Sequence, residues 1–204
     1  DVTVAGNRAE NGGGLANLGG TATLTNVTFS NNRAALYAGA IDMTGGTVSI
    51  TNATITDNSG GGISRRAGTL TAKNTALANS GSANCNPALT SATFSLSSDS
   101  TCSLGAGRDN IAMEFAALAY NGGFTLTRMP LPGNPVIDNG TGIGCPGTDQ
   151  RGVPRPSGLA CDVGAVDGWR RPRTGSGCRV MRCRVLRFVV IGVVLAGAVA
   201  CDGD

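Results

Sequence analysis

The sequence predicts an all-β fold, a right-handed parallel β-helix solenoid with three strands in each coil. Two observations lead to this prediction. Three short patterns recur in the same order along residues 1–80, and each alternates apolar with small polar residues, as a strand with one buried face does. The composition agrees, since 32 glycines and only 4% aromatic residues suit stacked repeats better than a compact core. After the coils we expect an irregular C-terminal cap and a disordered or hydrophobic tail.

The first pattern is a strand-like segment that ends in asparagine. Its copies occupy residues 1–7, 26–32 and 52–58, with a weaker fourth copy at residues 74–80. Their starts are therefore 25, 26 and 22 residues apart. Such a period is typical of one coil of a parallel β-helix.

Two further patterns keep this spacing. Three small residues followed by an aliphatic one occupy residues 12–15, 38–41 and 60–63. A Gly-Thr strand occupies residues 20–26, 46–52 and 68–74. Stacking the copies predicts three interior columns: Val4, Phe29, Ile55 and Leu77; Leu15, Ile41 and Ile63; and Leu24 with Ile50.

Asparagines mark the corners of the predicted coils. One set, which ends the first strand, is Asn7, Asn32 and Asn58, and a second, at the bend before the next coil, is Asn26, Asn52 and Asn74. Asparagine tolerates the left-handed conformation of sharp bends, and stacked amides can hydrogen-bond to one another. We therefore interpret both sets as structural ladders, although Asn26 and Asn52 also satisfy the glycosylation triplet.

Two cysteine pairs have spacings typical of closed loops, Cys85 with Cys102 and Cys145 with Cys161. As disulfides they indicate an oxidising compartment and hence export. The alternative is that they are free thiols that fill space in the interior. The surrounding sequence is polar and rich in glycine, which favours the disulfides.

The repeats resemble those of a known family of surface proteins. The FSNN word at residues 29–32 and the AGAI word at residues 38–41 are similar to the FxxN and GGAI elements of chlamydial polymorphic outer-membrane proteins. More broadly, residues 1–80 resemble the pectin-lyase-like superfamily of right-handed β-helices. The resemblance implies the right-handed β-helix fold and indicates little about function.

The second half resembles the C-terminal region of bacterial choice-of-anchor Q domain proteins. The shared words include NGGFTLT at residues 121–127, PGNPVID at residues 132–138, TDQRGVPRP at residues 148–156 and CDVGA at residues 161–165. This resemblance implies secretion and display at the bacterial surface, and no catalytic residues. Within TDQRGVPRP, we expect Asp149 and Arg151 to pair across a tight turn as a structural cap that closes the last coil. The alternative is that Arg151 or Arg155 binds a ligand.

The chain divides into three parts. Residues 1–80 form regular coils, which we interpret as a fragment whose N-terminal coils are missing, and residues 81–168 form irregular final coils and the C-terminal cap. Residues 169–204 are basic and then hydrophobic, either as a membrane anchor or as a fused signal-peptide-like segment in which Cys201 is a candidate for lipidation.

The charge distribution argues against nucleic-acid binding. The net charge of +3 comes from arginines of the tail, because residues 1–168 carry nine basic and eleven acidic residues. We therefore expect no nucleic-acid partner, and membrane contact only through the tail. With no histidine in the chain, no metal site or cofactor is expected.

These observations predict a non-enzymatic, secreted or cell-surface structural protein, adhesin-like in its role. Its ligand is unknown, a glycan or the surface of a host or neighbouring cell. The alternative is a polysaccharide lyase that acts on acidic glycans with calcium and an arginine base. The candidate residues for that chemistry are Asp42, Asp57, Arg65 and Arg66. They come from different strands of different coils, so we interpret them as solvated surface charges, with Asp42 pointing outward.

Overall fold

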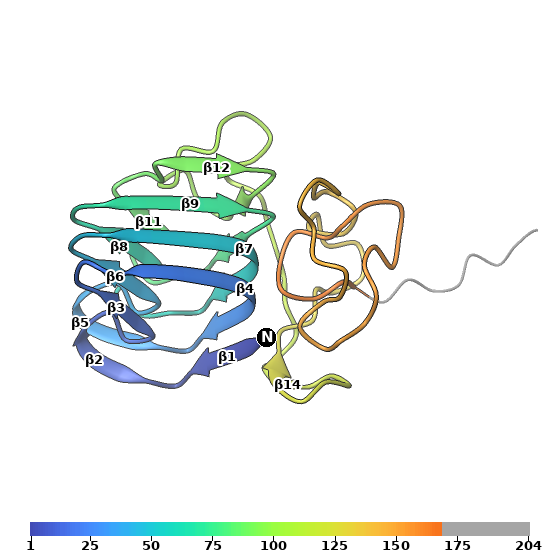
Figure 1. Ribbon diagram of the computed structural model, residues 1–204, viewed down its shortest axis with the longest axis horizontal. Helices are drawn as coiled ribbons and strands as arrows, with labels where there is room; N and C mark the ends of the chain where they lie inside the picture. Colours follow the sequence, from blue (N-terminus) through green and yellow to red (C-terminus); the bar gives the residue numbers. More distant parts are fainter. Residues whose placement is uncertain (169–204) are drawn as a thin grey trace, which may run out of the picture. The chain divides into compact units, whose positions relative to one another are not determined.

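The computed structural model describes residues 1–168. Its largest sheet has seven strands, and strands far apart in the sequence pair in parallel as the chain winds into a solenoid of about three turns (Figure 1). The strands of this sheet are β1 (Val2–Ala5), β4 (Thr21–Ser30), β7 (Thr47–Thr56), β9 (Thr69–Lys73), β10 (Ala76–Ala78), β12 (Ser91–Thr93) and β13 (Leu96–Ser97). The predicted all-β parallel solenoid is confirmed.

Three smaller sheets complete the described residues. A four-stranded parallel sheet contains β3 (Leu15–Asn17), β6 (Ile41–Met43), β8 (Ile63–Arg65) and β11 (Cys85–Asn86). Two short pairs are added by β2 (Arg8–Asn11) with β5 (Arg33–Tyr37), which are parallel, and by β14 (Ala119–Tyr120) with β15 (Leu126–Thr127), which are antiparallel. Residues 1–168 contain no helix, and Phe115 in the apolar segment at residues 112–120 forms an isolated bridge to Pro130.

Left-handed asparagines bend the chain at one corner of successive coils. Asn26 has φ of 52° and Asn52 of 51°, and each bends a long strand, β4 or β7, into two segments that face different directions. Asn74, with φ of 46°, makes the same bend between β9 and β10. A residue with Cβ rarely adopts this conformation, and asparagine is among those that tolerate it best. The left-handed corners predicted at this set are therefore confirmed. At the other corner the left-handed residues are Gly6, Asn31 and Asp57, one position before the predicted Asn7, Asn32 and Asn58.

The predicted interior columns are present in register. Val4 pairs with Phe29, Phe29 with Ile55, and Ile55 with Leu77 along the first column. The second column joins Leu15, Ile41, Ile63 and, as an addition to the prediction, Cys85. The third joins Leu24 to Ile50. Removing these side chains from water is the main stabilising contribution to the coils.

The first asparagine ladder is also present. The side-chain amide of Asn7 donates to Oδ1 of Asn32 at 3.0 Å, and that of Asn32 donates to Oδ1 of Asn58 at 3.0 Å. Asn58 in turn donates to the carbonyl oxygen of Phe29 at 3.1 Å. Asn32 and Asn58 are fully buried, and the ladder satisfies amide groups that would otherwise be costly to bury.

Residues 98–104 close the end of the solenoid after the last coil. Leu104 and the buried Cys102 pack against the core. The carboxylate of Asp99 accepts hydrogen bonds from the backbone of Asn84 and from Thr101. Partial burial acts to raise the pKa of Asp99, but the hydrogen bonds from Thr101, Asn84 and Ser97 outweigh it and hold that pKa below its ordinary value.

Residues 111–168 form the irregular C-terminal segment, which lies along one side of the coils (Figure 1, yellow to orange). It covers a column of outward threonines on the largest sheet, formed by Thr3, Thr28 and Thr54. Gln150 accepts a hydrogen bond from Thr28 Oγ1 at 2.6 Å and donates one to Thr3 Oγ1 at 3.0 Å. The backbone of Ala165 donates to Thr54 Oγ1 at 3.0 Å. These contacts bury Thr28 and Thr54.

Candidate functional site

The outward face of the four-stranded sheet holds one of the predicted site residues. Ala16, Asp42, Ser64 and Asn86 lie in one column across β3, β6, β8 and β11, because their strands pair in register. They alternate along each strand with residues that face the core. The prediction that Asp42 points outward from its strand is consistent with this column.

Asp42 is nevertheless buried, and the prediction of a solvated surface charge is wrong for it. Its side chain is 1% exposed, because Arg66 from the next coil lies over it. Nη2 of Arg66 is 2.5 Å from Oδ2 of Asp42, and Nε is 3.3 Å from Oδ1. Hydrogen bonding to Asp42 raises the pKa of Arg66 further, against the opposing effect of desolvation. The guanidinium also stacks on the ring of Tyr37, 4.4 Å from its centroid.

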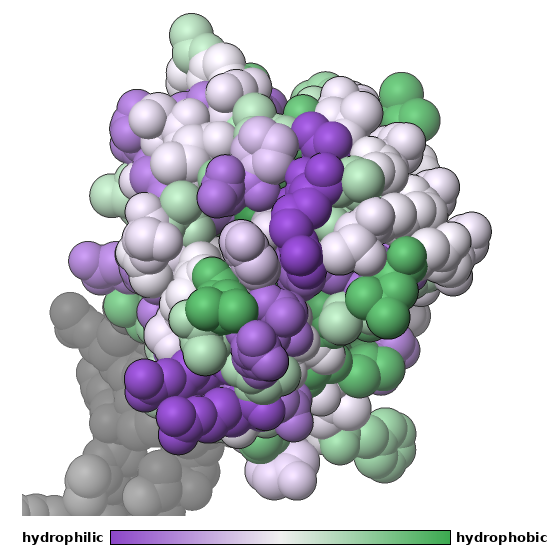
Figure 2. Space-filling view, turned by 90° about the vertical axis from the view of Figure 1, so that its left-hand side faces the viewer, coloured by the Kyte–Doolittle hydropathy of each residue, from purple (hydrophilic) through white to green (hydrophobic). Residues whose placement is uncertain are grey.

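A small pocket lies beside Tyr37. It has a volume of about 140 Å³, and the residues that line it include Leu36, Tyr37, Gly61, Ser64, Ser82 and Asn86. The lining offers an aromatic ring, three hydroxyls and an amide, which together suit a small polar group. Figure 2 looks onto the left-hand side of Figure 1 and shows a band of hydrophilic residues there, with hydrophobic residues in separate clusters beside it.

The other two candidate residues are not brought to this pocket. Arg65 donates from Nη2 to the carbonyl oxygen of Ala88 at 3.2 Å, so it ties two coils together. Asp57 lies at the end of β7 on the largest sheet and pairs with Nη2 of Arg128 at 2.7 Å. The structure therefore joins Asp42 with Arg66, and separates both from Asp57.

Arg128 fastens the C-terminal segment to the coils. Its side chain is 10% exposed, and besides Asp57 it contacts Ser30 Oγ at 2.9 Å through Nε and Asn31 Oδ1 at 3.2 Å through Nη2. A buried guanidinium with several donors engaged fixes position and orientation. This role could not be predicted from the sequence, because Ser30 and Asn31 lie 98 and 97 residues before Arg128 and the contacts follow no repeat.

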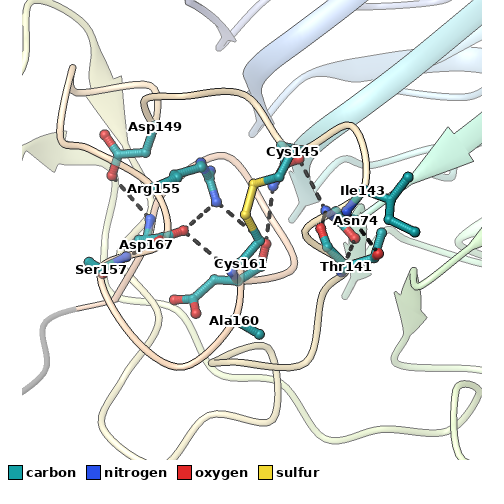
Figure 3. Close-up of a disulfide and its surroundings, with 12 residues drawn as sticks. Asn74, Thr141, Ile143, Cys145, Asp149, Arg155, Ser157, Ala160, Cys161 and Asp167 are labelled. Carbon is teal, nitrogen blue, oxygen red and sulfur yellow. Dashed lines mark hydrogen bonds and ion pairs between the residues drawn. A yellow bond between two sulfur atoms is a disulfide. The ribbon is translucent and has the colours of Figure 1, made fainter.

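A buried ionic cluster forms the centre of the C-terminal segment (Figure 3). Asp149 pairs with Arg151 at 2.7 Å, as predicted, across a turn in which Gly152 has φ of 82°. Arg155 pairs with Asp167, and both side chains are fully buried. Burial lowers the pKa of Arg155, while the neighbouring carboxylates of Asp167 and Asp149 act to raise it. The TDQRGVPRP word is thus structural, and it lies beside the first coils rather than over the last one.

Asp162 belongs to the same cluster and has a strongly shifted pKa. Burial raises its pKa to about 7, and the charge of Asp167 adds to the shift, against the hydrogen bond from the backbone of Gly168 and the charges of Arg155 and Arg151. Its two carboxyl oxygens accept from the backbone of Asp138 at 2.7 Å and of Gly168 at 2.6 Å. Loss of its proton therefore places an additional charge in a site with little water.

We expect this group to make the protein less stable as the pH rises. Because the folded pKa is above the unfolded value, the folded chain binds a proton between about pH 4 and pH 7 that the unfolded chain releases. The free energy of unfolding should therefore fall across that window and level off above it. Urea unfolding at pH 5 and pH 8 measures the difference, and Asp162→Asn should remove it. An unchanged difference in that variant would assign the effect to other groups.

Both predicted disulfides are present. Cys85 is bonded to Cys102 and Cys145 to Cys161, with Cα–Cα distances of 4.9 Å and 6.6 Å. The first fastens the closing loop to the coil before it. The second joins the strand-free loops that carry Thr141 and Asp167 (Figure 3), next to Asn74, which donates to the carbonyl oxygen of Thr141 at 3.0 Å.

Several expectations lie outside the described residues, among them the tail at residues 169–204 and the lipidation candidate Cys201. Within residues 1–168, no helix is long and apolar enough to cross a membrane. The same residues contain no group of three His, Cys, Asp or Glu side chains arranged to hold a metal ion. Comparisons with protein-family models, with curated proteins and with solved structures find no match for this chain.

Proposed function

We propose that the chain is a non-enzymatic scaffold displayed at a bacterial surface, where it acts as a structural or adhesin-like protein. The observation that supports this is the use of the candidate catalytic charges in structural contacts. Asp42 is covered by Arg66, and Asp57 holds Arg128 and through it the C-terminal segment. Asp42 and Asp57 are not placed to bind one calcium ion together, because Asp42 lies on the four-stranded sheet and Asp57 follows β7 of the largest sheet.

Export is supported by the two disulfides. Such bonds persist in oxidising compartments, outside the cytosol. The resemblance of the repeats to polymorphic outer-membrane proteins and to pectin-lyase-like β-helices, and of residues 81–167 to choice-of-anchor Q domain proteins, points the same way. In this proposal the basic and hydrophobic residues 169–204 supply the anchor, and the ligand is a glycan or a cell surface.

A lyase is the second candidate, because the pair of Asp42 and Arg66 lies next to the pocket beside Tyr37. A carboxylate and a guanidinium are groups that lyase chemistry uses. For Asp42 to hold calcium, however, Arg66 must first leave its carboxylate. Opening the pair would leave Asp42, whose side chain is 1% exposed, without its counterion. Leaving a buried carboxylate unpaired is costly in free energy.

Display at the surface can be tested with the chain's single lysine. Lys73 is the only lysine in the sequence, and it is partly exposed on the largest sheet. A membrane-impermeant amine reagent applied to intact cells should label the full chain, and Lys73→Arg should remove the side-chain label. Labelling that appears only after the cells are lysed would contradict display at the surface.

A further inference from the structure

The largest sheet carries a regular outward array of hydroxyl groups. Strands β4, β7, β9 and β12 pair residue for residue, so their outward side chains form straight rows across the strands. The rows are Thr21, Thr47 and Thr69; Thr23, Ser49, Thr71 and Ser91; and Thr25, Thr51, Lys73 and Thr93. Each of these positions except Lys73 bears a hydroxyl. We call this set the hydroxyl array.

The array stands on a rigid base. The residues between the outward positions face the core, and Val48, Ile50 and Leu70 are no more than 2% exposed. Threonine is branched at Cβ, which restricts its χ1 rotation. The hydroxyl and methyl groups of the array are therefore largely ordered before any ligand arrives, and this lowers the entropic cost of binding.

The spacing of the array is set by the parallel sheet. Neighbouring strands lie about 4.8 Å apart, and alternate residues along a strand lie about 6.6 Å apart. The repeat between strands is close to the shortest repeat between oxygen atoms on the surface of hexagonal ice, and the repeat along a strand is shorter than the next one. The rows of hydroxyls across the strands can therefore meet a water lattice at several positions at once, with each contact weak and the sum large.

The array is open to solvent, unlike the neighbouring threonine column. Its strands run side by side across the front of Figure 1, and its residues are exposed or partly exposed. Within residues 1–168, one hydrogen bond joins side chains of the array, from Thr71 Oγ1 to Ser49 Oγ at 3.3 Å. Thr28 and Thr54, by contrast, are buried under the C-terminal segment. The hydroxyls of the array thus remain available to a ligand.

The chemistry of the array distinguishes among ligands. Sugars in a polysaccharide surface are commonly held by stacking on aromatic rings, and none of the array positions is aromatic. A polyanion would need several cations, and the array holds Lys73 alone. Uncharged hydroxyls and methyl groups on a regular grid fit ordered water best. We propose that the hydroxyl array binds the surface of ice, a role that goes beyond display as a scaffold.

The test uses the full chain in an ice-recrystallisation assay and in growth of single ice crystals. The folded chain should slow recrystallisation and shape the crystals. Ser49→Tyr places a bulky ring in the middle of the array and should abolish both effects. Ala16→Tyr places the same ring on the exposed outward face of β3 and should leave them unchanged. Lys73→Thr completes the grid and should increase activity.

Circular dichroism and thermal unfolding establish that all variants are folded before the assays are compared. A folded wild-type chain with no effect on ice would overturn the proposal. Retention of activity in folded Ser49→Tyr would overturn it too, because the array would then not be the binding surface. Sedimentation of the chain with crystalline cellulose or chitin, without any effect on ice, would instead assign the array to a polysaccharide lattice.

Discussion

Replacing Asp167 by asparagine is expected to lower the free energy of unfolding by about 3–5 kcal/mol, the usual cost of removing one partner from a buried ion pair. Arg155 and Asp167 are both fully buried, so the substitution leaves a guanidinium charge without its counterion away from water. The neutral side chain must also replace the carboxylate oxygen that accepts from the backbone of Ser157 at 2.8 Å. Urea unfolding at pH 7 measures the effect.

The matched control for this substitution is Glu114→Gln. Glu114 carries the same kind of charge change on an exposed side chain of the same C-terminal segment, and exposed charges contribute little to stability. We expect its free energy of unfolding to stay within about 0.5 kcal/mol of the parent. A loss in Asp167→Asn no larger than that in the control would mean that the cluster is solvated.

Replacing Ile55 by alanine should cost about 2–5 kcal/mol, because the substitution leaves a cavity as well as removing buried apolar surface. Ile55 is fully buried and lies in register between Phe29 and Leu77 in the first interior column. A stacked column is flanked on both sides, so neighbouring coils can relax little into the space. Thermal and urea unfolding of the full chain measure the loss.

Ile55→Val is the graded control for the column. It removes one methylene group and should cost about 0.5–1.5 kcal/mol. Equal and small effects of the alanine and valine substitutions would contradict a close-packed column at this position.

The coils could be predicted from the sequence because their contacts repeat. Phe29 and Ile55 are neighbours because they hold the same position in successive copies of one repeat. Asn32 and Asn58 hydrogen-bond because each follows the same strand in successive coils. The pairing of Asp42 with Arg66 was also within reach, since they are 24 residues apart, about one coil. Asp42 is not a solvated surface charge, because the next coil places the side chain of Arg66 above it.

The C-terminal segment could not be predicted in the same way. Its contacts join residues with no shared pattern, such as Gln150 with Thr28, 122 residues away. The apolar residues 112–120 predict a short helix or an apolar turn, but they form no helix, and Phe115 bridges to Pro130. Long-range polar contacts of this kind leave no periodicity in a single sequence, so the side of the solenoid that the segment covers became apparent only in the structure.

The central claim is that Asp42, Asp57 and Arg66 make structural contacts and do not catalyse a reaction. A lyase assay on the full chain tests this claim most directly. The absorbance of unsaturated products is followed with a panel of acidic polysaccharides, with and without calcium, alongside Asp42→Asn. We predict no product from the folded chain under either condition, and none from the folded variant. Product formation by the parent that Asp42→Asn abolishes in a folded protein would contradict this account and identify the chain as a lyase.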